Sequence, residues 1–140
     1  MTKCEMAEQF FGEGFNCGAS VLACFCEDYD LDLELALKLA GGLGGGCTDG
    51  EICGAASGGV LAVGLKHGPY IKGDKGAKAN CHAKTAQYIE AFKQKHGALT
   101  CRDLLEDKPK GDDEESVRER RQFCLGLVKS AVETLEGLGY

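Results

Sequence analysis

The sequence predicts an all-α protein, a compact single-domain bundle of five or six helices that spans residues 1–140. Apolar residues recur at helical spacing along nearly the whole chain, and no stretch alternates apolar and polar residues as a half-buried strand does. The length of 140 residues is that of one ordinary domain. Both prolines, Pro69 and Pro109, fall between the helical stretches.

Three short helices are expected first. One covers residues 3–11. Asn16 is a good N-cap for a second, which runs to about residue 28 and has an apolar stripe. A third covers residues 32–40 and ends at the glycine pair 41–42, which suits a helix C-terminus.

A glycine-rich loop over residues 41–50 leads into the most apolar part of the chain. Residues 52–67 are apolar almost all round, and they are too long and too rich in alanine and glycine for a strand. Such a helix is usually central in its fold. Its small residues allow neighbouring backbones to approach closely.

The second half of the chain predicts two long helices and one short one. The long helices cover residues 79–96 and 114–135, and the short one covers residues 101–105. Thr100 followed by Asp103 resembles a capping box at the start of the short helix.

The charge and hydropathy of the chain argue against nucleic acid and membranes as binding partners. It has 16 Lys and Arg against 22 Asp and Glu, a formal net charge of −6, which argues against nucleic-acid binding. No apolar run reaches the length of about 20 residues that a bilayer requires. With no visible secretory leader, we expect a cytoplasmic protein without a membrane partner. Arg118, Arg120 and Arg121 are expected to pair with the acidic residues 112–115.

Nine cysteines are the feature that needs a chemical explanation. Nine is an odd number and the cytosol is reducing, so a full disulfide framework is not expected. No Cys-x-x-Cys sequence occurs. Any metal site must therefore be assembled from distant helices.

Four cysteines stand at positions that favour function. Cys17, Cys53 and Cys101 each stand at the start of a predicted helix, where free N–H groups and the helix dipole favour a thiolate. Cys124 faces inward from the middle of the last helix. Cys47 ends the glycine run and is a possible fifth member. The glycines there would let backbone N–H groups approach an anionic sulfur.

Four separate blocks of sequence carry a resemblance to a known family. The blocks are residues 14–19 (GFNCGA), 44–58 (with EICGAASG), 97–105 (GALTCRDLL) and Cys124. Together they resemble the C_GCAxxG_C_C family of small redox-active proteins, and the resemblance covers nearly the whole chain. It implies a redox role and places the signature cysteines at Cys17, Cys53, Cys101 and Cys124. Gly18 and Cys47 depart from the residues common in that family, an alanine and an apolar residue.

Three chemistries remain open for the four cysteines. The first is a [2Fe–2S] or [4Fe–4S] iron–sulfur cluster, which takes four thiolates. The second is a metal-free thiol–disulfide switch, with Cys17/Cys53 or Cys53/Cys101 as the pair. The third is a Cys4 zinc site, which usually includes a short Cys-x(2–4)-Cys knuckle that these positions lack.

Electron transfer or redox sensing is the mechanism that we expect, rather than turnover of an organic substrate. No paired carboxylates, Ser/His/Asp set or phosphate-binding loop of the right form is present. The expected partner is a redox protein, and a homodimer is left open.

Overall fold

The computed structural model describes all 140 residues and contains seven α-helices and no sheet. The helices are α1 (Lys3–Gly12), α2 (Cys17–Ala23), α3 (Leu33–Leu39), α4 (Gly54–His67), α5 (Lys75–His96), α6 (Cys101–Leu104) and α7 (Glu114–Gly137). The all-α class is confirmed. The expected count of five or six is too low, although a helix was expected in each of the seven places. The short helices α3 and α6 are separate elements, capped by Asp32 and Thr100.

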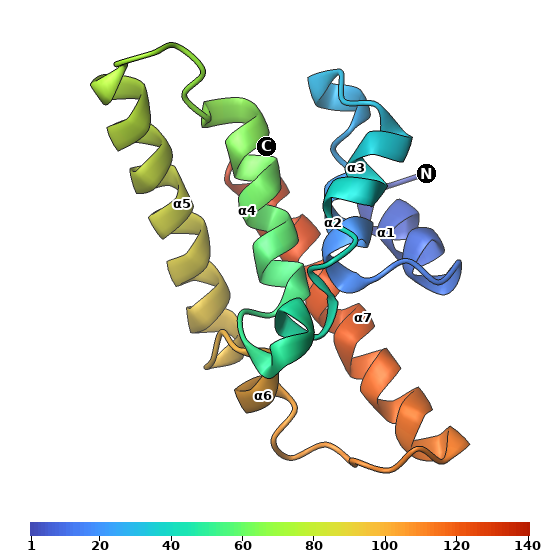
Figure 1. Ribbon diagram of the computed structural model, residues 1–140. Helices are drawn as coiled ribbons and strands as arrows, with labels where there is room; N and C mark the ends of the chain where they lie inside the picture. Colours follow the sequence, from blue (N-terminus) through green and yellow to red (C-terminus); the bar gives the residue numbers. More distant parts are fainter.

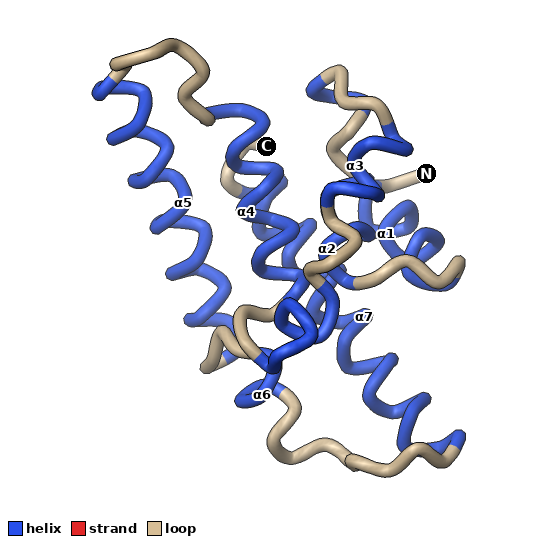
Figure 2. Tube along the Cα trace, viewed as in Figure 1, coloured by secondary structure: helices blue, strands red, loops and turns tan.

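The central helix is α4, as its apolar sequence predicts. It contacts α2, α5 and α7. In Figure 1, α5 lies on one side of α4, the pair α1 and α2 lies on the other, and α7 passes behind. The longest connection runs from α3 to α4 over residues 40–53 and includes the glycine loop. The connection from α6 to α7, residues 105–113, is a loop throughout (Figure 2). None of the helices is long and apolar enough to cross a membrane.

The main core contains side chains from α1, α2, α4, α5 and α7. Its largest fully buried side chains include Phe25, Tyr88 and Phe92. A smaller cluster between α2 and α3 contains Leu22 and Ala36. Burial of these apolar side chains is the main force that holds the short helices in place.

Close contact between α2 and α4 depends on glycine. A Cβ atom on Gly58 of α4 would lie 2.5 Å from the carbonyl oxygen of Gly18 and 2.7 Å from its Cα. Any side chain at Gly58 would therefore push the two helices apart. Because Gly18 directly follows Cys17, this packing sets the position of Cys17 beside the start of α4.

Several helix ends differ from the predicted ones, and three of these differences have an identifiable cause. Helix α2 stops at Ala23 rather than near residue 28, because the next turn tightens into i→i+3 bonds such as that from the Phe25 N–H to the Leu22 carbonyl. A 3-10 turn over Glu27–Tyr29 completes this segment. Helix α5 begins at Lys75 rather than at residue 79, because the Asp74 side chain caps it.

The third difference concerns the central helix. Helix α4 begins at Gly54, and Cys53 is its N-cap rather than its second residue. Ile52 is excluded from the helix because it forms an isolated antiparallel bridge with Thr100. The glycine loop before it turns tightly over residues 46–50, where Gly46, Cys47 and Thr48 adopt left-handed backbone angles.

Candidate functional site

The four predicted site cysteines line a single cavity of about 410 Å³. They reach it from four elements that are distant in sequence. Cys17 is the first residue of α2, Cys53 directly precedes α4, Cys101 is the first residue of α6, and Cys124 lies in the middle of α7. Cys53 is buried, and the other three are half-buried. The four elements that carry these cysteines, α2, α4, α6 and α7, approach one another in the lower middle of Figure 1.

An antiparallel bridge holds the segments of Cys53 and Cys101 together. The N–H group of Cys53 donates to the Leu99 carbonyl at 2.8 Å, and the N–H group of Cys101 donates to the Glu51 carbonyl at 2.7 Å. Arg102 strengthens the same contact, because its guanidinium donates to the Glu51 carboxylate at 3.0 Å. These bonds fix two of the four thiols relative to each other.

Asn16 fixes the position of Cys17 from two sides. Its Oδ1 atom accepts from the Ala19 N–H at 2.8 Å and so caps α2, as the sequence predicts. Its Nδ2 atom donates to the carbonyls of Ala40 and Gly41, each at 3.0 Å. One side chain thus provides hydrogen-bond partners for a free N–H group at the start of α2 and for free carbonyl groups at the end of α3.

Glycines bring backbone directly against the cavity. Gly44 and Gly54 both line it. A Cβ atom on Gly44 would lie 2.8 Å from the Cβ of Asn16, and one on Gly54 would lie 3.2 Å from the Cβ of Cys17. The glycine loop is therefore packed against the site, rather than serving only as a flexible turn.

Cys17 and Cys124 form a pair of thiols that share a proton. Hydrogen bonding toward the Cys124 sulfur raises the pKa of the Cys17 thiol far above its ordinary value. The same bond lowers the pKa of Cys124 to about 7, with help from the positive charges of Arg121 and Arg120. The predicted switch pairs were Cys17/Cys53 and Cys53/Cys101, and the pair whose pKa values shift in opposite directions is different from both.

The prediction of thiolates at the three helix starts is wrong. Burial raises the pKa of the Cys53 thiol, although the backbone N–H groups of Ala56 and Ala55 favour its ionised form. Burial and the nearby Cys124 sulfur raise the pKa of Cys101. Loss of water therefore outweighs the helix dipole at these positions. The thiol with the lowered pKa is the one in mid-helix.

Two arginines at the cavity were not recognised from the sequence. Arg120 and Arg121 line it, and neither forms the expected ion pair with acidic residues 112–115. Arg121 donates instead to the Phe11 carbonyl, and Arg120 to carbonyls of the loop before α7. Arg120 and Arg121 precede Cys124 by four and three residues, so all three lie on one face of α7. This spacing is the sequence signal that would have placed the two arginines at the site.

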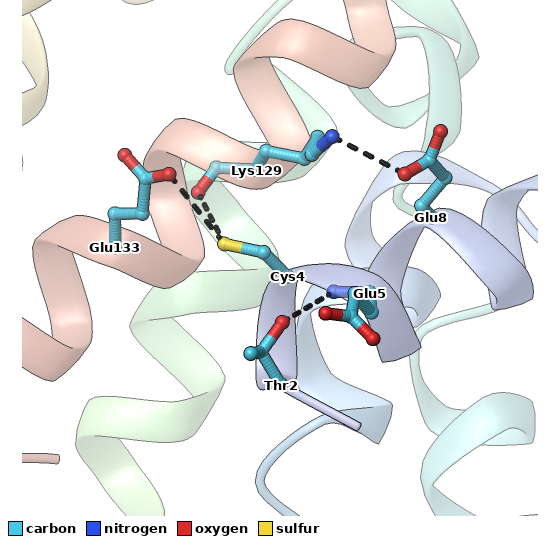
Figure 3. Close-up of polar contacts among 6 residues, drawn as sticks. All are labelled: Thr2, Cys4, Glu5, Glu8, Lys129 and Glu133. Carbon is cyan, nitrogen blue, oxygen red and sulfur yellow. Dashed lines mark hydrogen bonds and ion pairs between the residues drawn. The ribbon is translucent and has the colours of Figure 1, made fainter.

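The remaining cysteines lie outside the cavity. Cys47 is exposed in the tight turn of the glycine loop, with a φ of 56°, and is not among the residues that line the site. Figure 3 shows Cys4 on α1 directed toward α7, where its sulfur lies 3.6 Å from both the Lys129 carbonyl and the Glu133 carboxylate. Cys24 and Cys26 are buried at the end of α2, and Cys81 is half-buried on α5.

The four sulfurs surround the cavity rather than meeting at a single point. No three His, Cys, Asp or Glu side chains are close enough together to hold one metal ion. Around a tetrahedral zinc ion with Zn–S bonds of about 2.3 Å, neighbouring sulfurs would stand about 3.8 Å apart. Binding one zinc ion would therefore require the side chains to draw inward.

The chain matches no curated protein and no solved structure. A family model described as "Putative redox-active protein (C_GCAxxG_C_C)" matches residues 15–138. The match includes all four cysteines of the cavity and every helix except α1. The chain therefore belongs to the C_GCAxxG_C_C family, as the four sequence blocks predict.

Proposed function

We propose that the four-cysteine cavity binds an iron–sulfur cluster and that the protein acts in electron transfer or redox sensing. The observation that carries this proposal is the convergence of Cys17, Cys53, Cys101 and Cys124 on one cavity of about 410 Å³. Four thiolates are the ligand number of [2Fe–2S] and [4Fe–4S] clusters. The cluster would supply a one-electron couple, and a redox protein is the proposed partner.

The surroundings of the sulfurs suit a group of this size and charge. A cluster distributes its thiolate ligands over several metal ions, so sulfurs that surround a cavity fit it better than they fit one zinc ion. Cys53 sits at the N-terminus of α4, whose free N–H groups favour negative charge on its sulfur. A metal deprotonates a coordinating thiol outright. Binding would therefore release protons from Cys17, Cys53 and Cys101, whose pKa values are raised.

A metal-free thiol–disulfide switch is the second candidate, and the Cys17–Cys124 pair supports it. The Cys124 thiolate would attack a disulfide of a partner protein, form a mixed disulfide and release one partner thiolate. Cys17, after losing its proton, would then attack the Cys124 sulfur and release the second partner thiolate. The two cavity thiols are oxidised and the partner disulfide is reduced.

Quantitation of iron, sulfide and zinc in protein purified without oxygen tests the first candidate. We expect iron and sulfide in equal amounts and visible absorption. Serine at Cys17, Cys53, Cys101 or Cys124 should reduce both, whereas C81S, a cysteine outside the cavity, should not. C47S should behave as C81S does, because Cys47 does not line the cavity.

Colourless protein that binds no iron after reconstitution would overturn the cluster proposal. Counting free thiols in oxidised and reduced protein then tests the second candidate, the thiol–disulfide switch. A switch must lose two thiols reversibly on oxidation, and C124S should abolish that loss. If zinc alone is bound with one ion per chain, the zinc alternative replaces both.

A further inference from the structure

Arg120 and Arg121 are the only charged side chains among the residues that line the cysteine cavity. Both lie one helical turn before Cys124 on α7. They belong to a protein whose net charge is −6. Two positive charges therefore stand against four thiols, in a chain that is acidic elsewhere.

Hydrogen bonds to backbone hold both guanidinium groups in place. Arg121 donates to the Phe11 carbonyl at 3.0 Å and lies over the Phe11 ring, 4.5 Å from its centroid. Arg120 donates to the carbonyls of Pro109 and Gly111 at 2.6 and 2.8 Å. These partners are carbonyl groups rather than carboxylates, so the positive charges are oriented without being neutralised.

We propose that Arg120 and Arg121 form a cationic rim that stabilises negative charge on the sulfurs of the cavity. Arg120 is half-buried and Arg121 is exposed, and both line a cavity whose other lining residues carry no charged side chain. Charges beside such a cavity interact more strongly than charges in bulk water, because the surrounding dielectric constant is lower. The rim favours anionic reagents at the thiols and favours the reduced state of a thiolate-bound centre. Only its effect on a reduction potential rests on the proposed function.

Alkylation of the reduced, metal-free full-length chain tests the rim at the thiols themselves. Iodoacetate carries a negative charge and iodoacetamide does not, so the ratio of their rates at the cavity cysteines, followed by mass spectrometry, reports the local charge. We expect this ratio to fall severalfold in R120Q and R121Q and to fall further in the double variant. R121K should retain most of it, because it keeps the charge.

Arg118 provides the matched control. It is exposed on the same helix and does not line the cavity, so R118Q removes the same charge from the chain and should leave the ratio near that of the wild type. Wild-type protein gives a second test that needs no variant. The Debye length falls from about 10 Å at 0.1 M salt to about 3 Å at 1 M, so the preference for iodoacetate should decline over this range.

Equal ratios in R118Q and in the double variant, or a wild-type ratio that does not change with salt, would overturn the rim. These outcomes are independent of whether iron binds, so failure of the cluster proposal is distinguishable from failure of this one. In protein that shows a reversible redox couple, R120Q and R121Q should also lower the reduction potential. If the two arginines had only a structural role, the effects of R120Q and R121Q on the alkylation ratio would not add in the double variant, and R121K would not restore the ratio.

Discussion

At the scale of single residues, the thiol pair of Cys17 and Cys124 determines how the site responds to pH. The hydrogen bond between them favours the state in which one proton is shared. The pair therefore loses its first proton more easily, and its second with more difficulty, than two isolated thiols would. Apparent pKa values belong to the pair rather than to either residue.

This shared proton predicts a maximum in stability near pH 9 for the reduced, metal-free protein. Between the lowered pKa of Cys124, about 7, and the ordinary thiol value of 9.0, the unfolded chain binds two protons at these residues and the folded chain binds one. The free energy of unfolding therefore rises with pH in this range. Above pH 9 the unfolded chain binds none while the folded chain keeps one, so stability falls again.

Urea unfolding of the wild type and of C17S across pH 6–10 measures this effect. The difference in unfolding free energy between the two proteins should follow the predicted rise and fall. C81S is the control, since it removes a cysteine that lies on α5 outside the pair. A flat difference for C17S would show that the two thiols do not share a proton.

At the scale of helices, local sequence signals predicted most of the elements. Asn16, Asp32 and Thr100 cap α2, α3 and α6 as their residue types indicate. The early end of α2 at Ala23 was missed because tight i→i+3 bonds replaced helical ones without a glycine or proline to mark the change. The start of α4 was missed because Ile52 pairs with a segment almost fifty residues away, which no local pattern reports.

The contact between α2 and α4 predicts that Gly58→Ala is destabilising. The new Cβ would lie 2.5 Å from the Gly18 carbonyl oxygen, which is backbone and cannot rotate away. Overpacking of this kind costs about 1–3 kcal/mol. Because Gly18 adjoins Cys17, the variant should also weaken iron binding at the cavity.

Gly64→Ala is the matched control in the same helix. Nothing lies within 4 Å of a Cβ at Gly64, so alanine there should raise the free energy of unfolding by up to about 1 kcal/mol through its helix propensity. Chemical denaturation of G58A and G64A measures these changes in the free energy of unfolding. Equal stability of G58A and the wild type would mean that the two helices separate at little cost.

At the scale of the whole molecule, the cavity joins parts of the chain that are otherwise connected by loops. The four cysteines were predictable one by one, from cap positions and from resemblance to the family. Their meeting at one cavity, and the arrival of Arg120 and Arg121 beside them, depends on how α7 crosses α2 and α4. Such long-range packing leaves no signal at the spacing of a few residues.

The proposed cluster would therefore act as a crosslink between α2, α4, α6 and α7, and its removal should lower the melting temperature. A ligand present at 100 times its Kd stabilises the folded state by about 2.7 kcal/mol. For a chain of this size that corresponds to roughly 5–10 °C. The short α6, which has only four residues, should lose its order first, because its bridge to the start of α4 is its main tie to the fold.

Thermal unfolding of iron-loaded and chelator-treated protein measures this difference, with hydrogen exchange following the Cys101 and Leu104 amides. C101S should melt at one temperature whether or not iron is supplied, because one ligand to the crosslink is missing. C81S should keep the full difference, since Cys81 lies outside the cavity. If iron raised the melting temperature of C101S as much as that of C81S, the metal would be bound elsewhere and the cavity would not be the redox centre.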